Sequence, residues 1–148
     1  MKKNVLMGVF ASFIFSGSAF ASDLTGIWQS IDDKTGSPKA LIEITKAENG
    51  SFTGKIIKVT PRPGYTPKTM CVNCPAPYTN KPLVGLEVIH GLKHVENNNY
   101  ADGRILDPLT GKMYSLKGRL ASNNKRLTLR GYVGISAIGR TQTWIRQQ

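Results

Sequence analysis

Two cysteines lie three positions apart, at Cys71 and Cys74, and the chain contains no others. A Cys-x-x-Cys pair can form a local disulfide, exchange electrons or supply two metal ligands. A redox-active pair usually opens a helix, whereas Pro75 permits a helix only after the second cysteine. Haem attachment through Cys-x-x-Cys-His is excluded because Pro75 follows the pair. We expect a disulfide between Cys71 and Cys74, with redox activity as the alternative.

Both histidines, His90 and His94, lie four positions apart. On a helix they would share one face and could complete a Cys2His2 zinc set with the two cysteines. Gly91 lies between them, however, and the segment has the pattern of a strand followed by a turn, which would separate the two rings. We therefore expect neither a metal site nor another cofactor.

Four carboxylates fall within predicted strands, and none of them is placed as a catalytic pair. A glycosidase needs two carboxylates at a defined separation in a cleft, which the spacing of these residues does not indicate. The sequence also lacks a Gly-x-Ser-x-Gly motif, a phosphate-binding loop and a dinucleotide fingerprint. We expect no catalytic residues and rank an enzyme last among the possible functions. The four residues are Glu43, Glu87, Asp102 and Asp107.

The last segment with strand character, residues 139–146, carries polar and aromatic side chains on one face. Its alternation places Arg140, Gln142, Trp144 and Arg146 together. Tyr114 lies on another predicted strand, among polar or small neighbours. Ligand sites are mostly apolar with a few placed polar groups. We therefore take Tyr114, Arg140, Gln142 and Trp144 as candidate ligand-binding residues suited to an anionic amphiphile, with core packing as the alternative for the aromatic rings.

The elements that must position these residues are short strands joined by turns. Asn49-Gly50 is a typical hairpin turn, and residues 132–138 form a loop before the last strand. About eight strands in hairpin succession predict an all-β, antiparallel up-and-down barrel, because closure removes exposed edges. Such a barrel is either filled by side chains or holds one small ligand. The predicted strands cover residues 23–30, 40–46, 52–59, 83–92, 100–107, 112–120, 126–131 and 139–146, and residues 94–99 are a predicted turn.

The N-terminus has the layout of a secretory signal peptide. A basic start is followed by an apolar run over residues 5–15 and by the small-x-small site Ala19-Phe20-Ala21. We expect residues 1–21 to be removed and residues 22–148 to form one domain, located in the periplasm or secreted. The formal charge of +11 includes Lys2 and Lys3. The remaining basic surface is either simply solvated or attracted to anionic envelope surfaces, and nucleic acid is not an expected partner.

A tryptophan in Gly26-Ile27-Trp28 on the first strand, with an arginine on the last, resembles the lipocalin/calycin pattern. That resemblance implies that Trp28 closes one end of the barrel and that a late arginine packs over its indole, a cation–π contact. Arg146 suits this role better than Arg140. Gly26, Trp28 and Arg146 are thus the candidate barrel-closing residues.

A resemblance over almost the whole mature chain is to the bacterial domain-of-unknown-function family 2147, a set of small exported proteins. The matching motifs lie at residues 26–28, 71–74, 102–114, 129–132 and 139–146. The resemblance implies a lipocalin-like barrel and no established activity.

Two functional hypotheses follow from these features. The first is an exported barrel that binds a small amphipathic or lipidic ligand in the cell envelope, gated by the proline-rich segment 60–82. The alternative is a ligand-free interaction protein with a filled barrel, which contacts envelope proteins or polymers through its basic surface and the same segment. The volume of the barrel interior decides between them.

Overall fold

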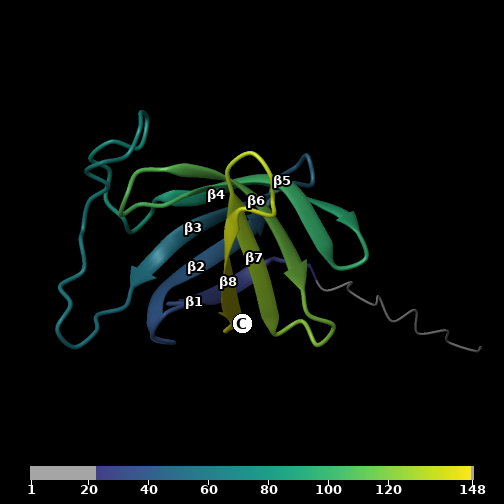
Figure 1. Ribbon diagram of the computed structural model, residues 1–148, viewed down its shortest axis with the longest axis horizontal. Helices are drawn as coiled ribbons and strands as arrows, with labels where there is room; N and C mark the ends of the chain where they lie inside the picture. The colour runs from purple at the N-terminus through teal and green to yellow at the C-terminus, as the bar shows by residue number, and fades with distance from the viewer. Residues whose placement is uncertain (1–22, 148) are drawn as a thin grey trace, which may run out of the picture.

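Eight antiparallel strands form a single sheet that closes on itself (Figure 1) in the computed structural model, which describes residues 23–147. Each strand pairs with the next, and the last returns to pair with the first, as expected for an up-and-down barrel. The predicted fold class is therefore confirmed. The predicted signal peptide, residues 1–21, lies outside the described residues. The strands are β1 (Gly26–Ile31), β2 (Pro38–Lys46), β3 (Phe52–Val59), β4 (Glu87–Glu96), β5 (Asn99–Leu106), β6 (Met113–Leu120), β7 (Arg126–Tyr132) and β8 (Gly139–Arg146).

Buried and exposed residues alternate along the strands, as the two-residue period of the sequence predicts. In β3, Phe52, Gly54 and Ile56 are buried, whereas Lys55 between them is exposed. In β7, Leu127 and Leu129 are buried beside exposed neighbours. Because successive side chains of a strand point to opposite faces, this alternation fixes which face of each strand lines the barrel.

The predicted bounds of the fourth strand are wrong. Residues 83–86 belong to the preceding loop, and β4 runs from Glu87 to Glu96, through most of the predicted turn at residues 94–99. The turn itself needs only Asn97 and Asn98, because Asn97 adopts a φ of 48° that closes a tight hairpin. The residues before it are mostly polar because they are exposed to solvent in the strand, and not because they form the turn.

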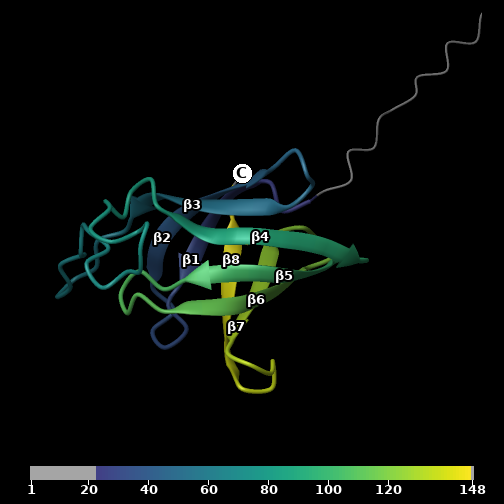
Figure 2. The same cartoon turned by 90° about the horizontal axis from the view of Figure 1, so that it is seen from above.

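The loops divide the barrel into two unlike ends (Figure 2). At one end the connections are short, spanning residues 47–51, 97–98 and 121–125. At the other end lie four loops, residues 32–37, 60–86, 107–112 and 133–138. The longest of these, residues 60–86, extends away from the barrel (Figure 1). We call the end with the short connections the sealed end and the end with the four loops the open end.

A disulfide joins Cys71 to Cys74 within the long loop, with their Cα atoms 5.4 Å apart. Both residues are buried, and both sulfur atoms lie near the carbonyl oxygen of Pro108, at 4.0 and 3.9 Å. Gly111 packs so closely on this segment that a Cβ placed on it would overlap the carbonyl oxygen of Asn73. The disulfide segment therefore holds the long loop against the β5–β6 turn at the rim of the open end.

Candidate ligand-binding cavity

The sealed end is closed by Trp28, which is completely buried. Its indole N–H donates to the carbonyl oxygen of Leu24 at 2.9 Å. The guanidinium of Arg146 lies over the indole, 4.3 Å from the ring centroid, because the two residues face each other across β1 and β8. This is the geometry of a cation–π contact.

Arg146 also satisfies three backbone carbonyls around the sealed end. It donates to Asn124 at 2.7 Å, to Thr25 at 2.7 Å and to Asp23 at 2.6 Å. Burial lowers the pKa of this guanidinium, and the nearby carboxylate of Asp23 opposes that shift. Gly26 enters β1 at a φ of 138°, which favours glycine. Trp28 and Arg146 thus tie the start of β1 to the end of β8 and to the β6–β7 turn.

Towards the open end the barrel encloses a cavity of about 640 Å³. Small-molecule sites typically measure about 300–1,000 Å³. Apolar side chains from seven strands line its interior, so that a hydrocarbon chain would meet aliphatic carbon and one indole. These residues are Ile42, Ile56, Val88, Leu106, Leu116, Leu129 and Trp144.

All four candidate ligand-binding residues line this cavity: Tyr114, Arg140, Gln142 and Trp144. The indole N–H of Trp144 donates to the side-chain oxygen of Gln142 at 3.2 Å. That bond uses the amide oxygen, and the NH2 group of Gln142 forms no hydrogen bond within residues 23–147. Gln142 can therefore donate to an oxygen atom of a bound molecule.

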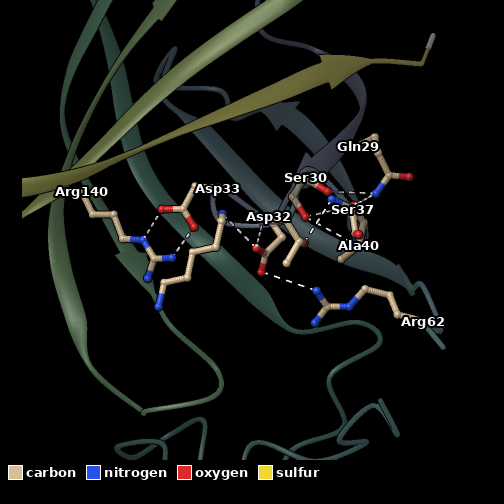
Figure 3. A network of polar contacts seen from close by, with 10 residues as sticks. Gln29, Ser30, Asp32, Asp33, Ser37, Ala40, Arg62 and Arg140 are labelled. Atoms are coloured by element: carbon tan, nitrogen blue, oxygen red, sulfur yellow. Dashed lines mark hydrogen bonds and ion pairs between the residues drawn. The ribbon is translucent and has the colours of Figure 1, made fainter. Parts of the chain in front are cut away.

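The mouth of the cavity carries a network of ion pairs between loops that are distant in sequence (Figure 3). Arg140 contacts both carboxylate oxygens of Asp33, with its Nε atom 2.6 Å from Oδ2. Arg62 lies 3.5 Å from the carboxylate of Asp32 and stacks on Tyr65 at 4.6 Å. The network joins the β1–β2 loop to the long loop and to the start of β8.

Hydrogen bonds hold both carboxylates in their ionised form. The backbone N–H groups of Thr35 and Lys34 donate to Asp32 and lower its pKa to about 2. The pKa of Asp33 is lowered by its hydrogen bond from Arg140, and the same bond raises the pKa of Arg140. The positive charge of Arg140 is thus already paired before any ligand binds.

Other basic side chains at the mouth have no such partner. Lys34, Lys39 and Lys68 line the cavity and form no ion pair in the part of the chain that the structure describes. Five basic residues line the cavity against two acidic ones, Asp32 and Asp107. The mouth therefore has a positive surplus that can receive an anionic group.

The ion pairs at the mouth lead to a prediction about acid stability. Because the carboxyl pKa values of Asp32 and Asp33 are lower in the folded state than in the unfolded chain, their contribution is present above pH 3.8 and is lost as pH falls; for Asp32 the loss extends to about pH 2. We expect Asp32→Asn and Asp33→Asn to unfold at lower temperature than the wild type at pH 6, and the difference to become smaller as the pH falls below 3.8. Melting curves from pH 2 to 7 test this. A difference that stays constant over that range would contradict it.

Sequence reasoning missed Asp32, Asp33 and Arg62. The turn-forming residues around Asp32 and Asp33 predict a loop, and nothing in the local sequence identifies the arginines that pair with these carboxylates. Asp33 and Arg140 are 107 positions apart and meet only because β8 closes on β1.

The two histidines lie on β4 in different surroundings. His90 is half-buried, packs against Tyr78 with the ring centroids 5.4 Å apart, and has its pKa lowered by burial. His94 is exposed, with Nε2 2.6 Å from the carbonyl oxygen of Asn97. Residues 23–147 contain no group of three or more histidine, cysteine or acidic side chains arranged to hold a metal ion. In the same range, no helix has the length and apolar character needed to cross a membrane.

Comparisons with known proteins agree with this architecture. The family described as "Uncharacterized protein conserved in bacteria" (DUF2147) matches residues 26–146. Among solved structures, protein HP1028 from the human pathogen Helicobacter pylori, described as belonging to the lipocalin family, matches with a TM-score of 0.71 and 24% identity. The match covers 85% of this chain and 84% of that chain, and it shows a shared fold. No curated protein matches the chain.

Proposed function

Because this chain belongs to the DUF2147 family of uncharacterised bacterial proteins and folds as a lipocalin-like barrel, we propose that it binds an anionic amphipathic molecule. The role is binding and not catalysis. A fatty acid or a lysophospholipid has the required chemistry: one hydrocarbon chain and one anionic group.

The cavity is the observation that carries this proposal. Its deeper part is apolar and its mouth is basic, so a ligand would place its chain beside Leu116, Leu129 and Trp144 and its anionic group near Lys39 and Lys68. Burial of each CH2 group stabilises such a complex by about 0.8 kcal/mol. In a lysophospholipid, the NH2 group of Gln142 would donate to an ester oxygen between the hydrocarbon chain and the anionic group.

We further propose that the protein acts in the periplasm or after secretion. The signal-peptide pattern over residues 1–21 supports export, and the Cys71–Cys74 disulfide suits an oxidising compartment. The long loop supplies Arg62, Tyr65 and Lys68 to the mouth, and it would form the wall that a ligand passes on entry.

The alternative function, a ligand-free interaction protein, requires a barrel filled by its own side chains. A cavity of about 640 Å³ gives that alternative no support. An anionic envelope surface is compatible with the binding role, because it attracts the same basic side chains that surround the mouth.

Titration of the delipidated mature chain tests the proposed function. Oleate, lysophosphatidylglycerol and the uncharged oleyl alcohol are added separately, and binding is followed by native mass spectrometry and thermal shift. We expect one molecule of either anionic ligand per chain and at least tenfold weaker binding of oleyl alcohol. Absence of binding to all three would overturn the proposal, and equal affinities would overturn the role of the basic mouth.

A further inference from the structure

Exposed apolar side chains are concentrated at the open end of the barrel. Among the described residues, nine large apolar side chains are exposed, and eight of them lie on the loops of the open end. The exception, Val95, is near the β4–β5 turn at the sealed end. The eight are Tyr65, Met70, Val72, Val84, Leu109, Val133, Ile135 and Ile138.

The β7–β8 loop carries the most exposed of these residues. Val133, Ile135 and Ile138 are 69%, 62% and 71% exposed, and residues 133–138 include no charged side chain. In Figure 2 this loop projects from the barrel beyond the ends of β7 and β8. Three aliphatic side chains within six residues thus face solvent together.

Arg130 fixes the shape of this loop. Its Nε atom donates to the carbonyl oxygen of Ser136 at 2.6 Å, and its Nη2 atom donates to that of Ala137 at 3.2 Å. A backbone bond from Ile138 to Ile135, at 3.2 Å, closes the turn. These hydrogen bonds therefore hold the loop in a conformation that leaves its aliphatic side chains exposed.

The loop adjoins the basic mouth. Val133 and Ile138 line the cavity together with Lys34, Lys39 and Lys68. Aliphatic side chains that project beside unpaired lysines match the two layers of an anionic membrane surface, with acyl chains below and phosphate groups above. Docking to a protein would require a complementary apolar groove on that partner. Docking to a bilayer requires only that the aliphatic side chains reach the acyl chains and that the lipid headgroups are negatively charged.

We propose that residues 133–138 insert into the surface of an anionic phospholipid bilayer and place the mouth of the cavity against it. The lysines of the mouth contact the phosphate groups, and the three aliphatic side chains enter the boundary with the acyl chains. The purpose of this docking rests on the proposed function, because a mouth that faces the bilayer exchanges an amphipathic ligand with it directly.

Co-sedimentation with vesicles tests the docking. The mature chain is mixed with vesicles of phosphatidylglycerol and phosphatidylethanolamine, or of phosphatidylcholine alone. We expect binding to the anionic vesicles, weakened by salt, and about tenfold weaker binding after Ile135→Asp, because this change removes an aliphatic side chain and adds a repelled charge. The matched control is Val95→Asp at the sealed end, which should bind vesicles like the wild type.

Ile135 does not line the cavity, so Ile135→Asp should keep the wild-type affinity for oleate. Unchanged vesicle binding by Ile135→Asp, or no vesicle binding by the wild type, would overturn the docking. Self-association of the wild type that Ile135→Asp abolishes, without vesicle binding, would assign the loop to a contact between two copies instead. Oleate binding without vesicle binding contradicts only the docking, and vesicle binding without oleate binding contradicts only the proposed function.

Discussion

Replacing Trp28 with alanine is expected to lower the free energy of unfolding by about 3–5 kcal/mol. The indole is completely buried and is the largest fully buried side chain, so its removal leaves a void in the core at the sealed end. It also removes the ring beneath the guanidinium of Arg146. Urea unfolding followed by circular dichroism measures the loss.

Trp28→Phe is the matched variant. It keeps an aromatic ring for Arg146 but loses the hydrogen bond to the Leu24 carbonyl and part of the buried ring volume, so a loss of about 1–3 kcal/mol is expected. If Trp28→Ala does not fold, the phenylalanine variant still reports on the site. A loss below about 1 kcal/mol for Trp28→Ala would show that the sealed end does not depend on this residue.

A phenylalanine at position 131 is expected to weaken oleate binding by about 100-fold or more, equivalent to about 2.7 kcal/mol. Gly131 lines the cavity, and a Cβ placed on it would meet Ile105 and Tyr114 at 3.6 Å, an ordinary van der Waals distance. The added ring would therefore occupy space that the ligand needs. Because that space is empty of protein atoms, Gly131→Phe should melt close to the wild-type temperature.

Thr128→Phe is the control for this experiment, since Thr128 is exposed on the outer face of the same strand. The control should bind oleate like the wild type, as measured by isothermal titration. Wild-type affinity of Gly131→Phe for oleate would show that the ligand binds outside the cavity.

The closed barrel and its inward faces could be predicted because hairpin strands with a two-residue period have few other stable arrangements. Trp28 and Arg146 could be paired for a related reason: each lies on a terminal strand, and closure brings those strands together. Tyr114, Gln142 and Trp144 could be placed inside from alternation alone, since each lies on the inward face of its strand.

Whether the interior is filled or hollow could not be predicted, and two glycines on neighbouring strands show why. A Cβ on Gly118 would come within 2.9 Å of Leu129, whereas a Cβ on Gly131 meets only ordinary contacts and borders the cavity. Both are glycines in alternating strands and look alike in the sequence. The space at each glycine depends on side chains that other strands bring beside it. The pairing of Asp33 with Arg140 likewise depends on segments that are distant in the sequence.

The exposure of the aliphatic side chains in residues 133–138 could not be predicted from the sequence either. Its small and aliphatic residues predict a loop, but the same residues could have folded inward over the mouth. The bonds from Arg130 to Ser136 and Ala137 turn Val133 and Ile135 outward, and these bonds cannot be deduced from composition.

The first and last residues that the structure describes both lie at the sealed end. Arg146 bonds the carbonyl oxygen of Asp23, and the backbone N–H of Gln147 bonds that of Ile27 at 2.7 Å. An affinity tag, a fluorophore or a surface linker attached directly before Asp23 or after Gln147 would therefore sit opposite the mouth. Immobilised through such a linker, the molecule would present its cavity outward, which suits it to use as an oriented sensor for amphipathic compounds.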